Sequence, residues 1–154
     1  MDSIVSVFSS LLFGSPESQI RSSVRGICKA MVASAAALES FSKKKGLAEH
    51  YYSDYAAQAL MSRPGWKEIE TNVFESKKGR IIQIKNDYSV ADVCLLVVLS
   101  EIADHTGTQD ISSDTEMIIV DEFKKMFGSD YSDKKIDQVI HDWRESSKYE
   151  DNSD

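Results

Sequence analysis

The sequence of 154 residues has no run of eighteen or more consecutive apolar residues, so we expect no membrane-spanning helix. It also has no GxxxxGK[ST] or GxGxxG phosphate loop, no GxSxG nucleophile elbow and no HExxH zinc motif. Each absence argues against a class of enzyme whose chemistry depends on that motif. We therefore expect a protein that is not an enzyme.

Cysteine and histidine are scarce. The two cysteines, Cys28 and Cys94, each lie in an apolar helical run, which predicts buried free thiols and suits a reducing compartment. The three histidines are widely spaced and lack the CxxC or HxxxH companions of a zinc site; they are His50, His105 and His141. We interpret these histidines as surface residues.

The first residues, MDSIVSVFSSLLFG, have an apolar centre but neither a positively charged start nor a small-residue cleavage site. They match a secretory signal poorly, so we expect a cytoplasmic protein. A helix over residues 3–13 would carry one apolar face, formed by Ile4, Val7, Phe8, Leu11 and Leu12. This face favours docking on the protein's own bundle or on a second subunit, with peripheral membrane contact as the alternative.

The net charge of −7 is unevenly distributed along the chain. Residues 1–48 carry 6 basic against 3 acidic side chains, and residues 49–86 carry 6 against 5. Residues 87–154 carry 6 basic against 17 acidic side chains, so the acidic excess lies there. This field repels nucleic acid and attracts cations or basic partners, so we expect a protein partner and no nucleic acid.

Apolar residues recur at helical spacing through most of the chain. Ser15-Pro16 is typical of a helix start, and the pattern predicts helices over residues 15–42, 47–62 and 66–74. The stretch GRIIQIKN at 79–86 fits either a short strand or a helix or extended linker. It has no evident partner strand, which favours helix or linker.

The last third carries clear helix boundaries. Ser89 followed by Asp92 opens one helix in the manner of a capping box, and Ser113 followed by Glu116 opens the next. Gly128 is a C-terminal stop. The apolar faces of these helices predict core positions at Leu95, Leu96, Val98, Leu99, Ile118, Ile119, Phe123, Ile140 and Trp143.

Together these patterns predict an all-α single domain, a helical bundle of six or seven helices. Its parts would be an N-terminal amphipathic helix at 1–14, a helical domain at 15–147 and an acidic tail at 148–154. Residues 19–76 and 89–147 show the same order of elements, which raises the hypothesis of two pseudo-repeated helical hairpins.

The acidic loop between the helices that begin at Ser89 and Ser113 is the main candidate site. It contains four carboxylates within thirteen residues, namely Asp104, Asp110, Asp114 and Glu116. Hard cations prefer oxygen ligands, so these residues are candidate ligands for calcium. Counted from Asp104, however, glycine is fourth and glutamate thirteenth, which does not fit an EF-hand. Helix capping and solvated surface charge form the alternative interpretation.

The segment IADHTGTQDISSDTEMIIVDEFKKMFG, followed by SDYSDKKIDQVIHDW, resembles the TerB-like family associated with tellurite resistance. The resemblance covers residues 90–143 and rests on an apolar helix, a glycine-containing acidic loop, a Ser-x-x-Glu helix start and an FG stop. Asp104 aligns with the start of the family's acidic loop, and Glu116 with the carboxylate that opens the following helix. The Asp-Gly pair usual in that loop is absent here.

The resemblance implies a non-enzymatic helical binding module of a bacterial stress-response system, whose acidic surface binds a cation or a protein. The alternative is a small acidic cytoplasmic adaptor or secretion chaperone that holds a partner protein. Secretion chaperones of this size usually contain a multi-strand sheet. A strand content above a fifth of the chain would therefore favour the chaperone, and near-total helix would favour the TerB-like module.

Overall fold

The computed structural model describes residues 16–44, 52–128 and 132–151. The helix predicted over residues 3–13 lies outside this part of the chain. Of the predicted acidic tail at 148–154, only the first four residues are described, as the end of a helix.

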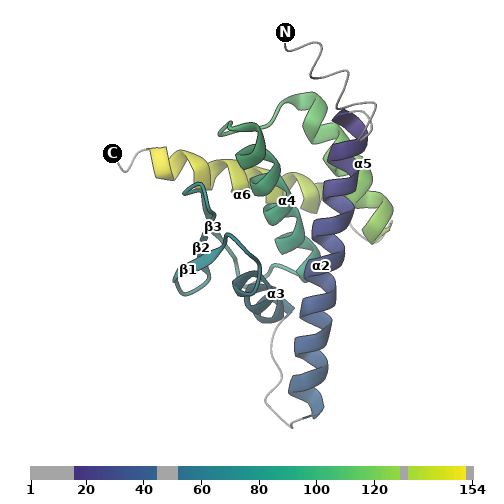
Figure 1. Ribbon diagram of the computed structural model, residues 1–154, viewed down its shortest axis with the longest axis vertical. Coiled ribbons are helices and arrows are strands. Elements are labelled where there is room, and N and C mark those ends of the chain that lie inside the picture. Colours follow the sequence, from purple (N-terminus) through teal and green to yellow (C-terminus); the bar gives the residue numbers. More distant parts are fainter. Residues whose placement is uncertain (1–15, 45–51, 129–131, 152–154) are drawn as a thin grey trace.

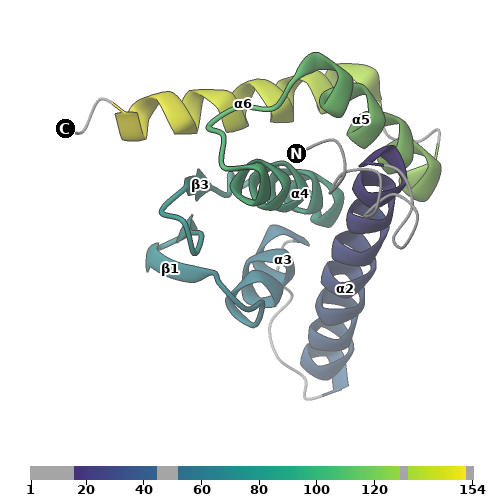
Figure 2. The same cartoon turned by 45° about the horizontal axis from the view of Figure 1, so that its top comes forward.

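Five helices and three strands are present in the described residues: α2 (Pro16–Lys44), α3 (Tyr52–Met61), β1 (Lys67–Glu70), β2 (Val73–Glu75), β3 (Ile81–Gln83), α4 (Val90–Thr106), α5 (Ser113–Phe127) and α6 (Asp133–Asp151). Helix α4 lies at the centre and contacts α2, α3, α5 and α6 (Figure 1). Helix α2 packs against α3 and α5, and α6 lies along the opposite side of α4, next to β3 (Figure 2).

Helix α4 is central because its sequence is apolar on all sides. Its start is the predicted capping box: the Ser89 hydroxyl accepts from the Asp92 amide, and the Asp92 carboxylate accepts from the Ser89 amide. Between residues 92 and 103 every side chain except Glu101 is buried. A helix buried on all faces belongs in the interior of a bundle, so the other elements pack around it.

We expect Leu99→Ala to reduce the free energy of unfolding by about 2–5 kcal/mol, because the Leu99 side chain is fully buried and its removal leaves a cavity. Urea unfolding of the two proteins would measure the difference. Met117→Ala is the matched control, because Met117 is 69% exposed and its truncation opens no cavity. Equal losses for the two variants would contradict this packing of α4.

The structure is mostly helical, as predicted, but the described residues contain five helices and a small sheet and do not form the all-α bundle of six or seven helices. Strands β1, β2 and β3 form an antiparallel meander in that order. The turn between β1 and β2 contains Asn72 with a φ of +62°, a conformation that asparagine tolerates better than most residues. The inner face of the sheet is apolar, since Phe74 and its partner Ile82 are fully buried.

The physical reason for the error is strand length. Strands of three or four residues are too short to show an alternating pattern, and the apolar residues of 66–74 happen to match helical spacing. The partner that GRIIQIKN at 79–86 appeared to lack is β2, which overlaps the end of the region predicted as a helix. Residues 19–76 contain two helices followed by two strands, whereas residues 89–147 contain three helices. The two segments therefore do not form the predicted pseudo-repeat.

Several other helix boundaries agree closely with prediction, whereas the start predicted at residue 47 lies outside the described residues, which take up α3 at Tyr52. Helix α2 begins at Pro16 as expected, and Gly128 follows the end of α5 with a φ of +77°. The cap of α5 is Ser112 and not Ser113, because the Ser112 hydroxyl accepts from the Thr115 amide. Of the nine predicted core residues eight are buried, and Ile118 is half-buried.

Candidate functional site

The acidic loop joins the end of α4 to the start of α5. Gly107 ends α4 in the left-handed conformation, with a φ of +73°, and its amide donates to the carbonyl oxygens of Ala103 and Asp104. Of the four predicted site residues, Asp104 belongs to the last turn of α4 and Asp110 to the loop itself. The other two, Asp114 and Glu116, lie in the first turn of α5. The fold therefore spreads them along the connection.

Asp104 is bound to a cation from its own chain. The Arg80 Nε donates to the Asp104 carboxylate at 3.1 Å, and the Ser76 hydroxyl donates to its second oxygen at 2.6 Å. The two terminal nitrogens of Arg80 donate to the carbonyl oxygens of Gln109 at 2.9 Å and Thr108 at 2.8 Å. The guanidinium thus binds one carboxylate and two loop carbonyl oxygens. These are the oxygen ligands that a calcium ion would need.

Arg80 is also buried against the core of the protein. Only 7% of it is exposed, and its guanidinium carbon is 4.9 Å from the centre of the Trp143 ring. The Trp143 indole nitrogen donates to the Ser100 hydroxyl at 2.9 Å, and that hydroxyl donates to the Leu96 carbonyl at 2.7 Å. A chain of contacts therefore runs from the acidic loop through Arg80 to the middle of α4.

A second arginine holds the other side of the loop. Arg144 of α6 donates to Asp110 at 3.0 Å and 3.3 Å and to Glu116 at 2.5 Å. Partial burial opposes the charged form of Arg144, but the hydrogen bonds to these carboxylates outweigh it and raise its pKa. The side chain of Asp114 is exposed and takes no part in this cluster as the structure describes it.

The geometry does not support the predicted calcium site. Within the part of the chain that the structure describes, no three His, Cys, Asp or Glu side chains form a group that could hold a metal ion. The loop carboxylates instead bind the two arginines. Sequence reasoning missed both, because Arg80 is 24 residues from Asp104 and Arg144 is 34 residues from Asp110. The only signal was the acidic excess of residues 87–154, which indicates that basic side chains compensate these carboxylates in the fold.

The two cysteines lie at the contact between α2 and α4, and their burial was predicted from the sequence. Cys28 and Cys94 are both fully buried and are free thiols. A hydrogen bond with Cys28, together with burial, raises the pKa of Cys94. A buried thiol with a raised pKa is a poor nucleophile. The pair therefore serves as packing between the helices.

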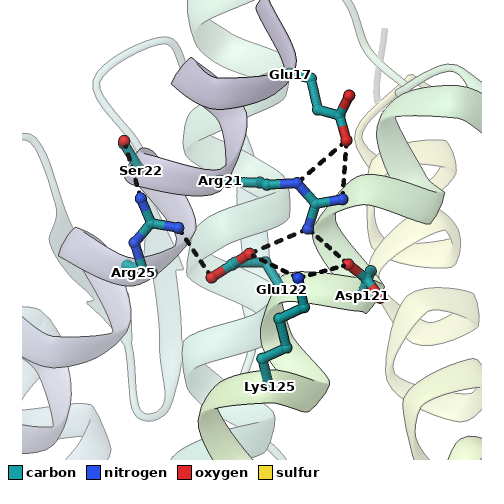
Figure 3. A network of polar contacts seen from close by, with 7 residues as sticks. All are labelled: Glu17, Arg21, Ser22, Arg25, Asp121, Glu122 and Lys125. Carbon is teal, nitrogen blue, oxygen red and sulfur yellow. Dashed lines mark hydrogen bonds and ion pairs between the residues drawn. The ribbon is translucent and has the colours of Figure 1, made fainter.

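A network of charged side chains fastens α2 to α5 (Figure 3). Arg21 donates to Glu17 on its own helix at 2.9 Å, and across the contact to Asp121 at 2.6 Å and Glu122 at 3.0 Å. Arg25 reaches the other oxygen of Glu122, also at 3.0 Å. Glu122 is buried, so two guanidinium groups compensate its charge where water cannot.

This network predicts a dependence of stability on pH. The hydrogen bond from Arg25, reinforced by Arg21, holds the pKa of Glu122 below its ordinary value of 4.5. The resulting stabilisation is complete above that value and is lost as the pH falls through the lower pKa of the folded protein. We expect Glu122→Gln to flatten the loss of stability between about pH 5 and pH 3, measured by urea unfolding at each pH.

The exposed carboxylate of Asp114 supplies the control for this pH series. Asp114→Asn removes the same charge without touching an arginine, so it should keep the full slope. If Glu122→Gln retained the wild-type slope as well, the network would not contribute to acid sensitivity.

An apolar groove opens between α2, α3 and the start of α4, and we name it the α2–α4 groove. It is lined by Val32, Ala35, Ala36, Tyr55, Ser89, Val90, Ala91 and Phe127, and its volume is about 360 Å³. Val32 is 39% exposed, although it is a large apolar residue. Seven of these eight lining residues are apolar or aromatic, so the surface suits an apolar group.

No protein-family model, no curated protein and no solved structure matches this chain. No helix within residues 16–44, 52–128 and 132–151 has the length and apolarity needed to cross a membrane.

Proposed function

We propose that the protein is a non-enzymatic binding module that holds a partner protein in the α2–α4 groove. The observation that carries this proposal is the apolar lining of the groove, in which Val32 is exposed and Val90 and Phe127 are partly buried. Exposed apolar surface of this kind is unfavourable in water unless a partner covers it. The occupant is a segment of another protein that inserts a large apolar side chain.

The rim of the groove indicates the charge of that segment. Val90 and Ala91 are the first two residues of α4, so the positive end of the helix dipole lies at the groove. Lys29 lies one turn before Val32 on α2 and is exposed. The partner segment therefore carries a carboxylate next to its apolar side chain, in contrast to the basic partner that the net charge alone favours.

The resemblance of residues 90–143 to TerB-like proteins supports a place for this module in a bacterial stress response in the cytoplasm. The secretion chaperone is the weaker alternative. Strands of four, three and three residues fall far below a fifth of the chain, the content that would favour a chaperone.

A random-peptide phage library, selected on the full-length protein, tests this proposal. We expect enriched peptides with a large apolar residue next to Asp or Glu. Synthetic versions of these peptides should bind the wild-type protein and lose at least about tenfold in affinity with Val32→Asp, because a buried carboxylate in the groove would be unpaired. Met117→Asp is the matched control, since Met117 is exposed on α5 and does not line the groove.

Two results would contradict the proposal. One is a selection that yields no peptide sensitive to Val32→Asp. The other is a concentration-dependent dimer that Val32→Asp dissolves, because the groove would then be occupied by a second copy of the chain. Sedimentation of both variants across a range of concentrations distinguishes these outcomes.

A further inference from the structure

Asp92 is a buried carboxylate in the first turn of α4, directly after the residues that line the α2–α4 groove. Only 1% of it is exposed. Ser89, Val90 and Ala91 line the groove, and the Ser89 amide donates to the Asp92 Oδ2 at 2.8 Å. The carboxylate is therefore fixed within one helical turn of the surface where the proposed partner segment binds.

The two oxygens of this carboxylate have different surroundings. Oδ2 accepts from the Ser89 amide, and the Lys135 ammonium of α6 lies 3.7 Å from it. Oδ1 is buried and has no hydrogen-bond partner among the described residues. A buried carboxylate with an unsatisfied oxygen is costly to ionise. Burial therefore raises the pKa of Asp92, and the contacts with Ser89 and Lys135 offset only part of this rise.

Lys135 is the cation that favours the ionised form of Asp92. Its ammonium also lies 3.4 Å from the Asp87 carboxylate and 5.5 Å from the centre of the Tyr88 ring, so its charge is shared. Burial raises the pKa of Tyr88, and its hydroxyl stays neutral. On the side of α4 that faces α2 (Figure 2), Tyr55 is the one titratable side chain among the described residues that line the groove.

A proton on Asp92 would remove its charge and leave the start of α4 intact. With the proton on Oδ1, Oδ2 still accepts from the Ser89 amide, and the Ser89 hydroxyl still accepts from the Asp92 amide. The ionised carboxylate, in contrast, opposes the positive end of the α4 dipole, which attracts a carboxylate of the partner. The protein interior screens this charge less than water does, so it acts on the groove without touching the partner.

We propose that the ionisation of Asp92 regulates the α2–α4 groove: the ionised form weakens the binding of an acidic segment, and the protonated form strengthens it. This inference rests on the proposed function of the groove. Because a fall in pH protonates Asp92, the affinity for an acidic segment rises as the pH falls. The carboxylates of the segment, with an ordinary pKa of about 4, remain ionised until the solution is more acidic.

An acidic peptide from the phage selection is the probe, and the same peptide with its carboxylates replaced by amides is its control. Calorimetry with the full-length protein should show about threefold tighter binding of the acidic peptide at about pH 5.5 than at about pH 7.5, the usual effect of one charge near a helix end. The amide peptide should bind equally at both pH values, because it has no charge for Asp92 to repel.

Two variants assign the pH response to Asp92. Asp92→Asn keeps an oxygen for the Ser89 amide and has no charge, so it should bind the acidic peptide equally tightly at both pH values. Lys135→Met removes the cation that lowers the pKa of Asp92, so the rise in affinity should move to higher pH. Asp114→Asn removes one negative charge from the start of α5, outside the groove lining, and should keep the wild-type response.

The results that overturn this inference differ from those that overturn the proposed function. A peptide that depends on Val32 but binds the wild-type protein equally at both pH values would overturn the regulation alone. So would a pH response that persists in Asp92→Asn or stays in place in Lys135→Met, a variant that leaves the capping residues unchanged. If no selected peptide depended on Val32, both the function and its regulation would be overturned.

Discussion

Arg80→Met is expected to reduce the free energy of unfolding by about 3–5 kcal/mol, the usual cost of removing one partner from a buried ion pair. Methionine keeps the apolar stem and removes the guanidinium. Asp104 then loses its cation, and the carbonyl oxygens of Thr108 and Gln109 lose their donors. Urea unfolding monitored by circular dichroism would measure the difference.

Arg144→Met is the matched control for Arg80→Met. Arg144 also binds carboxylates of the acidic loop, but its side chain is 34% exposed, so solvent screens its ion pairs. We expect a loss below about 1 kcal/mol for this variant. Losses of similar size in the two variants would mean that the burial of Arg80 does not determine how much it contributes to the free energy of unfolding.

Trp143→Ala is the second change with a large expected effect, about 3–5 kcal/mol of unfolding free energy. Trp143 is 1% exposed and is the largest fully buried side chain of the described core. Its removal leaves a cavity against α4, deprives Ser100 of its donor and takes the ring away from Arg80. Thermal and urea unfolding should both report the loss.

The smaller substitution Trp143→Phe separates packing from the polar contacts of the ring. Combined with Arg80→Met, the ring-free substitution Trp143→Leu forms a double-mutant cycle that isolates the interaction between the guanidinium and the indole. We expect a coupling free energy of about 0.5–2 kcal/mol, the range for a cation over an aromatic face. Strict additivity would contradict an energetic contact between these two residues.

Helices α4 and α5 were predictable because their own sequences contain signals for where they begin or end. Ser89 with Asp92 and the stop at Gly128 act within one helical turn, so a short stretch of sequence contains the information. The sheet was not predictable in this way. Its stability depends on pairs such as Phe74 with Ile82, which lie in separate strands of three residues. No local pattern distinguishes those strands from a helical face.

The sequence also identified the acidic loop, but it did not identify the two arginines that bind the loop, Arg80 and Arg144. Carboxylates and a glycine between two helices can be read directly from residues 104–116. The identity of the cation depends on which distant side chains the fold brings to the loop. Arg80 arrives there because the meander places it beside the end of α4, and Arg144 because α6 crosses the loop. The residues close to the loop in the sequence give no indication of either contact.

The burial of α4 on every side determines how its backbone exchanges hydrogen with solvent. A helix enclosed by α2, α3, α5 and α6 cannot open without separating the elements around it. Its amide hydrogens between residues 93 and 103 therefore exchange only when the whole domain unfolds, whereas the ends of α2 exchange through local fraying. A ligand that binds only the folded protein would slow exchange of all these α4 amides by one common factor.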